Sequence, residues 1–272
     1  MASKVGSRAA FCLSGDRLRT LAQFAVFRTA RGLGIEDKSM NLDSRIIVSL
    51  DFPAAASAVD LVKQLGANAT FYKVGLQLLT AAGPSVVREL VDAGKSVFLD
   101  LKLLEIPSSV AGAVTAAGQL GASMVTVHAS GGSAVLRSAV QAASPFPQLK
   151  ILALTVITSM RDRDLEEVGV ASTVREQVVR LARLANAAGC HGVVSSPLEA
   201  RLLCEVLPPG ALIVTPGTQL SGAERSDHAR AASPAQAIEA GATHVVIGRP
   251  ISHALNPAAV FASVCAELTA AM

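Results

Sequence analysis

Short apolar runs alternate with longer segments of helical pattern from residue 45 onward. Each of the eight runs is 5–8 residues long, and most are rich in Val, Ile and Leu. That pattern is typical of strands buried in a parallel sheet. Between the runs, apolar residues are spaced by three and four, as in Val59, Leu61, Val62 and Leu65. The predicted strands are residues 45–52, 71–75, 96–102, 124–129, 150–157, 192–196, 212–217 and 244–249.

Glycines mark many of the places where a predicted helix ends and the next strand begins. A helix C-terminus favours a residue of positive φ, which glycine adopts without strain. The junction glycines are Gly66, Gly94, Gly121, Gly189 and Gly241. Their recurrence supports a chain of successive βα units.

Eight βα units either close into a barrel or lie open as a doubly wound sheet. No GxGxxG motif follows the first predicted strand, so the dinucleotide-binding form of the open sheet loses its main support. The short, evenly distributed strands favour a single-domain (β/α)8 TIM barrel over residues 40–272.

The composition agrees with such a barrel. Of the 272 residues, 51% are hydrophobic but only 3% are aromatic, so the core must consist mainly of Ala, Val, Leu and Ile. No apolar stretch reaches the roughly 18 residues of a membrane span. Cys12, Cys190, Cys204 and Cys265 form no CxxC or other ligand spacing, which argues against a disulfide framework and a zinc site. We expect a cytoplasmic protein.

Residues 1–39 depart from the barrel pattern. They are rich in Ser and Arg and carry a net charge of +4, whereas the remainder carries −1. A nearly neutral barrel has no electrostatic footprint for nucleic acid. We expect this basic extension to be poorly ordered or to reflect a misassigned start, with Met40 as the true start; its composition also permits a transit peptide.

Charged residues stand at the ends of the first three predicted strands. Asp51 ends the first, Lys73 lies in the second, and Asp100 and Lys102 end the third. Because Asp100 and Lys102 alternate with apolar residues, both point to the same side of their strand. The carboxyl ends of barrel strands form the active-site mouth. We predict that these four charges converge there, either as a functional acid–base cluster or as an ion-pair network that closes the barrel.

A second candidate group follows the last strand. Gly248 and Arg249 precede a predicted helix, where barrels of this type often bind phosphate. His128 is interpreted as a satisfied core histidine, because no second ligand stands at metal spacing with it; we assign no metal. Thr158 and Ser159 lack the Ser–His–acid pattern of an activated nucleophile.

Motifs along about residues 45–265 resemble the bacterial orotidine 5′-phosphate decarboxylases. They are VSLDFP, FYKVGLQLLTAAGP, VFLDLKxxEIP, TVHASGG, LTVITSM, GVVSSPLEA, TPG and VIGRPI, in the order that the family has. The resemblance implies a homodimeric barrel with shared active sites and no cofactor or metal. It also implies conversion of orotidine 5′-monophosphate (OMP) to uridine 5′-monophosphate (UMP), with carbon dioxide released.

The resemblance also implies residue roles. Lys102 matches the lysine that protonates C6 of the base, and Asp100 matches the carboxylate beside the departing carboxylate. Lys73 matches the lysine that links this cluster to the ribose, and Glu105 stands where the family has a catalytic aspartate that reaches the partner's site. The implied substrate-binding residues are Asp51, Thr158, Ser109, Pro216, Gln219, His228, Gly248 and Arg249.

The chain departs from the family pattern near these residues. Leu104 and Glu105 replace His and Asp, and Ser108-Ser109 replaces Asn-Thr. Gln219 replaces Arg, and His228 replaces Gln. Three alternatives therefore stand beside an active decarboxylase: a divergent paralogue acting on another phosphorylated small molecule, a metal-dependent sugar-phosphate enzyme of the same fold, and a nucleotide-binding protein with reduced or no catalysis.

Overall fold

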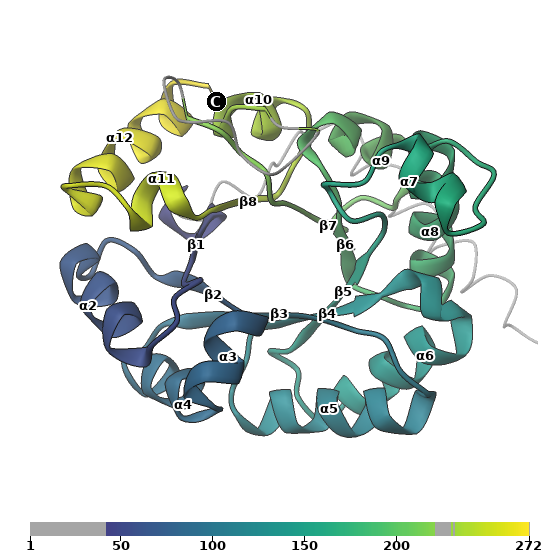
Figure 1. Cartoon of the computed structure of the whole chain (residues 1–272), viewed down its shortest axis with the longest axis horizontal. Coiled ribbons are helices and arrows are strands. Elements are labelled where there is room, and N and C mark those ends of the chain that lie inside the picture. The colour runs from purple at the N-terminus through teal and green to yellow at the C-terminus, as the bar shows by residue number, and fades with distance from the viewer. Residues whose placement is uncertain (1–41, 221–229, 231, 272) are drawn as a thin grey trace, which may run out of the picture. The chain divides into compact units, whose positions relative to one another are not determined.

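Eight parallel strands form a closed ring with helices around it (Figure 1). The computed structural model describes residues 42–220, 230 and 232–271, so the prediction made for residues 1–39 lies outside the described residues. The strands are β1 Ile46–Ser49, β2 Phe71–Gly75, β3 Ser96–Leu103, β4 Met124–His128, β5 Lys150–Leu154, β6 Gly192–Val194, β7 Leu212–Thr215 and β8 His244–Ile247. Each pairs with its neighbour in sequence, and β8 pairs with β1, which confirms the predicted TIM barrel.

The helices follow the strands around the outside. They are α2 Ala55–Leu65, α3 Leu76–Ala82, α4 Ser85–Asp92, α5 Pro107–Gln119, α6 Gly132–Ala143, α7 Asp162–Glu167, α8 Val174–Ala187, α9 Ala200–Val206, α10 Pro234–Glu239, α11 Arg249–Ser252 and α12 Pro257–Ala270. Short 3-10 turns are η2 Leu42–Arg45, η3 Ala129–Gly131 and η4 Pro197–Glu199. None of the described helices has the length and apolar content needed to cross a membrane.

Local sequence signals start and stop several helices. At the start of α8, the Thr173 hydroxyl accepts from the Glu176 N–H, and the Glu176 carboxylate accepts from the Thr173 N–H at 2.9 Å. Ser233 and Gln236 form the same reciprocal cap at α10. Such caps satisfy N–H groups that a helix start leaves without partners. The five junction glycines all have positive φ, between 63° and 102°, as predicted.

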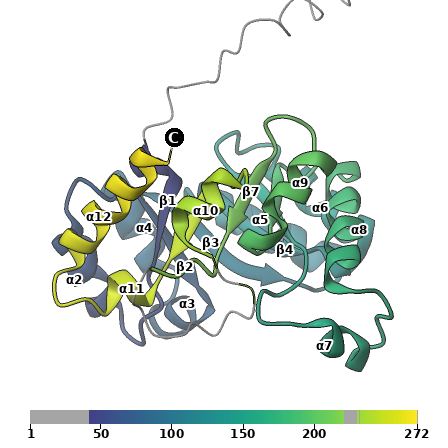
Figure 2. The same cartoon turned by 90° about the horizontal axis from the view of Figure 1, so that it is seen from above.

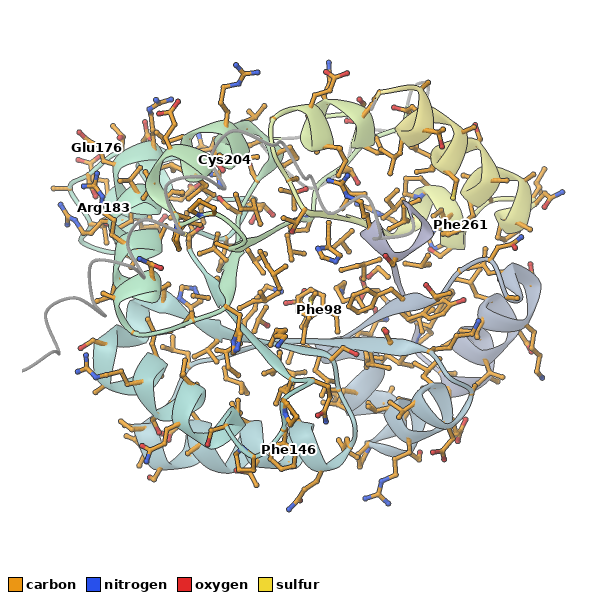
Figure 3. The ribbon with its side chains drawn as sticks, turned by 180° about the vertical axis from the view of Figure 1, so that it is seen from behind. Phe98, Phe146, Glu176, Arg183, Cys204 and Phe261 are labelled. Atoms are coloured by element: carbon orange, nitrogen blue, oxygen red, sulfur yellow. The ribbon has the colours of Figure 1, made fainter. Side chains whose placement is uncertain are left out.

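The strands separate two apolar layers. Ile47, Phe71, Phe98, Met124, Leu152, Leu154, Val194, Val214 and Val246 fill the inside of the barrel. Phe98 lies in the middle of the ring, whereas Phe146 and Phe261 lie in the outer helical layer (Figure 3). The alternate residues, such as Ile46, Val48, Val97 and Leu99, pack against the helices. Because both faces are apolar, the strands read as nearly continuous apolar runs.

Several strands end earlier than predicted. The first strand stops at Ser49 and not at residue 52, and the fifth stops at Leu154 and not at residue 157. The fourth strand ends one residue early, and the sixth, seventh and eighth strands each end two residues early. The third runs one residue further than predicted, to Leu103. The apolar run continues beyond β5 because Val156 is buried in the core and Ile157 lines the cavity described below. Hydrophobicity therefore did not mark where the hydrogen-bonded ladder ends.

His244 lies buried at the start of β8, opposite the end that carries the charged residues. Its Nδ1 is 2.9 Å from the Thr243 hydroxyl, and its ring meets the Phe71 ring edge-on. Burial, together with the nearby charge of Arg45, lowers the pKa of His244 to about 4. A histidine held neutral in the fold but free to protonate when unfolded makes stability pH-dependent.

We predict that the free energy of unfolding falls as pH drops from about 6.5, the ordinary histidine pKa, towards 4. In that window the unfolded chain binds a proton at His244 that the folded chain does not. His244→Asn should be less stable than the native chain at pH 7 but lose less stability between pH 7 and pH 5. Urea unfolding at several pH values measures both. The pKa values of His128 and His191 are also lowered by burial, so the variant keeps part of the slope of unfolding free energy against pH. Equal slopes in the two proteins would contradict the prediction.

Candidate active site

A cavity of about 910 Å³ opens at the carboxyl ends of the strands. Side chains from β1, β2 and β3 form one wall, and the loops after β5, β7 and β8 form the other. The helices α3, α7 and α11 follow these strand ends and lie toward the same side of the barrel, the lower side in Figure 2. A concave site of this size, with apolar residues and a few polar groups, is typical of small-molecule binding.

The four charges predicted to converge do converge on the first wall. Lys102 Nζ donates to Asp100 Oδ1 at 2.8 Å, and Lys73 Nζ lies 3.8 Å from Asp100 Oδ2. Lys73 Nζ also donates to Asp51 Oδ1 at 3.0 Å. The chain of contacts thus runs Asp51–Lys73–Asp100–Lys102, with the two signs alternating. This geometry confirms the predicted convergence.

Burial differs along this chain of charges. The side chains of Lys73 and Asp100 are 9% and 7% exposed, whereas Lys102 and Asp51 are 35% and 50% exposed. A buried charge is costly unless it is paired, so the two inner groups depend on each other and on the outer two. The outer groups face the cavity and are accessible to a bound molecule.

Strand alternation explains why Lys73 and Asp100 point inward. Lys73 lies two residues after Phe71, and Asp100 two residues after Phe98, and both phenylalanines fill the barrel interior. Side chains two apart on a strand share a face. Lys102 continues on the same side, but its backbone does not follow the strand: its φ is 50°, the only positive φ of a non-glycine residue in the described ranges. The β3–β4 register shifts between Leu99 and Leu103.

Asp51 keeps its negative charge well below neutral pH. Its partial burial acts to raise the carboxyl pKa, but attraction by Lys73 and Lys102 and hydrogen bonds from Ser49 and Lys73 outweigh it. The net pKa is therefore lower than that of an ordinary aspartate. The Ser49 hydroxyl donates to Asp51 Oδ2 at 2.5 Å. Asp51 is thus an ionised acceptor held at the edge of the cavity.

The second wall carries the residues predicted to bind phosphate and base. Of the predicted binding residues, Thr158, Pro216, Gln219, Gly248 and Arg249 all line the cavity. Gly248 ends the turn after β8, and Arg249 is the first residue of α11. Charges on one wall and an arginine on the other therefore face the same space.

Hydrogen bonds tie the loops of the second wall together. The Thr218 hydroxyl donates to the Val246 carbonyl at 3.0 Å, which holds the loop after β7 against β8. Arg230 lies 3.0 Å from the buried carboxylate of Glu199, after β6, and its Nη1 donates to the Met160 carbonyl, after β5. Three loops are thus joined through one guanidinium.

Two predicted site residues lie away from this cavity. Glu105 and Ser109 are exposed and are not among the lining residues. The Glu105 carboxylate accepts from the neighbouring Ile106 N–H at 2.6 Å. His228 lies outside the described residues, so its placement is not tested. Within one chain, the structure brings together Lys73, Asp100 and Lys102 but not Glu105.

Three polar residues of the site were missed at the sequence level. Ser49 holds Asp51, Thr126 contacts Asp100 and Lys102, and Arg230 joins the loops. Thr126 had a visible signal, since it is the one polar residue between the apolar Met124, Val125 and Val127. Arg230 had none, because its partners are distant in sequence.

His128 behaves as a satisfied, half-buried histidine. Its Nδ1 contacts the Ser130 hydroxyl at 2.6 Å. Burial and the charge of Lys102 lower its pKa. Within the described ranges, no group of three or more His, Cys, Asp or Glu side chains could hold a metal ion.

The comparisons with known proteins agree with this geometry. The model of the orotidine 5′-phosphate decarboxylase/HUMPS family matches residues 44–264. The chain belongs to this family. Family members named orotidine 5′-phosphate decarboxylase include one from Halorhodospira halophila, 49% identical over 228 residues, covering 84% of this chain and 97% of that protein. Another, from Pseudoalteromonas translucida, is 46% identical over 222 residues, 81% of this chain and 95% of its own.

A solved structure from the same family supports the fold. The crystal structure of orotidine 5′-phosphate decarboxylase from Lactobacillus acidophilus superposes with a TM-score of 0.73 at 33% identity. The match covers 82% of this chain and 98% of that one. The barrel and its strand order are therefore those of a family member.

Gly75 leaves room for the Asp51–Lys73 ion pair, and this gives a test. A Cβ at position 75 would lie 2.8 Å from Asp51 Oδ1 and 2.9 Å from Lys73 Nζ. The φ of Gly75 is −97°, which any residue can adopt, so only the close contact of the added Cβ with Asp51 and Lys73 opposes a side chain there. We predict that Gly75→Ala lowers stability by only about 1 kcal/mol, because flexible side-chain ends can move. A crystal structure of the variant should show Lys73 Nζ displaced from Asp51.

Gly112→Ala is the matched control. Gly112 is exposed within α5, and an added Cβ meets nothing within 4 Å. Alanine at an open helical position should raise stability by about 0.5–1 kcal/mol and leave the ion pair in place. An undisturbed Asp51–Lys73 pair in Gly75→Ala would show that the glycine is not needed for it.

Proposed function

We propose that this protein decarboxylates OMP to UMP, the last step of de novo pyrimidine biosynthesis, without a cofactor or metal. The observation that carries the proposal is the Lys73–Asp100–Lys102 cluster, which faces the same cavity as Arg249. OMP carries an anionic group at each end, a carboxylate on the base and a phosphate on the ribose. The names of the relatives at 46% and 49% identity support this substrate.

Lys102 performs the proton transfer in this proposal. When the bond between C6 and the carboxylate breaks, carbon dioxide leaves and the electron pair stays on C6. A fixed ammonium group beside C6 stabilises that developing negative charge. Lys102 then donates one of its protons to C6, which gives UMP, and it regains a proton from solvent. The Lys102 side chain is 35% exposed and the Lys73 side chain 9%, so Lys102 is the lysine that the base can reach.

Asp100 and Lys73 hold Lys102 in position. Asp100 accepts a hydrogen bond from Lys102. Asp100 also lies next to the substrate carboxylate, and repulsion between the two carboxylates favours the departure of the substrate carboxylate as carbon dioxide. Lys73 offsets the charge of Asp100 from the other side and holds Asp51 at the ribose. Each charge in this row therefore lies beside a charge of opposite sign.

The opposite wall binds the rest of the nucleotide. Arg249 binds the phosphate, for which a guanidinium offers paired donors. Thr158 contacts the edge of the pyrimidine, and Gly248 lets the backbone approach the phosphate. Pro216 and Gln219 border the phosphate, and His228 is a further hydrogen-bond donor to it. Binding energy from this remote phosphate holds the base against the charged cluster, where it lowers the barrier.

A homodimer completes the site in this proposal. Leu104 and Ile106, on either side of Glu105, are 56% and 60% exposed. Large exposed apolar side chains around a charged residue are typical of an interface. In the dimer Glu105 and Ser109 reach the partner's cavity, which accounts for their position outside their own. We place the enzyme in the cytoplasm, and the free thiols Cys190 and Cys204 suit a reducing compartment.

The decisive experiment mixes the purified protein with OMP and follows the ultraviolet change on conversion to UMP. The native chain should turn over OMP. Lys102→Ala should lower kcat by roughly 10³-fold or more, because both charge stabilisation and proton donation are lost. Lys63→Ala, which removes an exposed lysine of α2 outside the cavity, is the matched control and should retain full activity.

Growth of a uracil-requiring strain that expresses the protein is a second readout. A native protein that binds UMP but leaves OMP unchanged would favour the nucleotide-binding alternative. Turnover of a different phosphorylated compound in place of OMP would favour the divergent paralogue.

Shared sites predict that two inactive variants restore each other. Lys102→Ala and Glu105→Ala should each have little activity alone. Refolded together, half of the dimers are mixed and each mixed dimer has one complete site, so about a quarter of native activity should return. Analytical ultracentrifugation checks that the protein is a dimer. A monomer, a fully active Glu105→Ala variant, or a mixture that stays inactive would contradict the shared site.

A further inference from the structure

Thr126 lies buried in the middle of β4, beneath the charged cluster. Its relative exposure is 0%. The hydroxyl accepts from the Lys102 backbone N–H at 2.8 Å and donates to Asp100 Oδ1 at 3.0 Å. One side chain therefore contacts both the backbone of one charged residue and the carboxylate of the other. It is not among the residues that line the cavity.

The backbone around Lys102 explains why a hydroxyl is needed there. At Lys102 the chain adopts a φ of 50°, and the β3–β4 ladder shifts register. A positive φ in a lysine is costly and persists only where its surroundings hold it. The Thr126 hydroxyl provides the acceptor that the Lys102 N–H uses in place of a regular ladder carbonyl.

Accepting this bond also orients the hydroxyl's single proton. A hydroxyl has one proton to donate, and here it points at Asp100 Oδ1. The same oxygen accepts from Lys102 Nζ at 2.8 Å, while Oδ2 faces Lys73. The rotation of the carboxylate is thus fixed by two donors on one oxygen and an ammonium group beside the other.

We propose that Thr126 is a positioning residue for the decarboxylation, which sets the Lys102 backbone and the Asp100 carboxylate so that the Lys102 ammonium meets C6. The proposal rests on the function proposed above. Thr126 acts only through these two residues. Ribose and phosphate are held by other elements, so loss of the hydroxyl alters the chemical step and leaves nucleotide binding intact.

The test compares Thr126→Val with Thr126→Ser. Valine keeps the shape but removes the hydroxyl, and serine keeps the hydroxyl. We expect Thr126→Val to lower kcat by roughly 10²-fold, as a misplacement of about 1 Å does, with KM and the Kd for UMP within about threefold of native. Thr126→Ser should recover most of kcat. Crystal structures should show the Lys102 φ and the Asp100 contacts kept in the serine variant and changed in the valine variant.

Thr243→Val is the matched control. At the opposite end of the barrel, the Thr243 hydroxyl accepts from the Ile213 N–H and donates to the Ile213 carbonyl, each at 3.0 Å. Its removal also costs one bond from a backbone N–H and one to an oxygen, together with the contact to His244, far from the cluster, so stability should fall while kcat stays native. If Thr126→Val does not fold, Thr126→Cys replaces it, because a thiol is a weak donor of similar size.

The outcomes separate the two proposals. Suppose that the native enzyme is active on OMP. If Thr126→Val then has a native kcat, or has a raised KM in place of a lowered kcat, the positioning role is overturned and the proposed function stands. A fall in kcat that Thr243→Val matches, or that Thr126→Ser does not recover, has the same consequence. A native chain inactive on OMP overturns the proposed function, and the positioning role with it.

Discussion

The site depends on one buried carboxylate that is paired with two ammonium groups. Asp100 is 7% exposed and lies between two ammonium groups, one on each of its oxygens. Burial of Lys73 and Asp100 beside the apolar barrel interior would be costly if either lacked its partners of opposite charge. Asp51, Ser49 and Thr126 complete the set of contacts. The barrel mouth is therefore a neutral group of fixed charges, preorganised before any substrate arrives.

The barrel makes this arrangement possible because its strands bring distant residues to one rim. Lys73 and Asp100 come from adjacent strands, and each follows an apolar residue that fills the interior below it. The rest of the cavity wall is built mainly from loops, which need further support to hold their shape. The Arg230 contacts with Glu199 and Met160 supply it, and they join the segments after β5, β6 and β7. A rim of paired charges thus borders loops that are tied to each other.

Apolar periodicity was sufficient to predict the barrel and the convergence of the four charges, because strand alternation determines which face a residue takes. It did not predict the ends of β5 to β8, and beyond β5 the apolar run continues outside the ladder through Val156 and Ile157. It also missed the positive φ of Lys102 and the role of Thr126, which depend on how β3 and β4 meet. Contacts such as Arg230–Glu199 join residues far apart in sequence and leave no local pattern.

The departures just after β3 share one location, whereas another departure, Gln219, lines the cavity. Leu104, Glu105 and Ser109 lie on an exposed segment outside the cavity of their own chain, whereas the charged cluster inside it is intact. In a two-fold symmetric dimer every change at the interface occurs on both subunits, so the two copies adjust to each other. In the proposed dimer, a longer acidic side chain at Glu105 needs only a small change in how the subunits meet. A substitution at Asp100 or Lys102 has no such freedom, because each neighbour within the chain is already fixed by another charge or hydrogen bond.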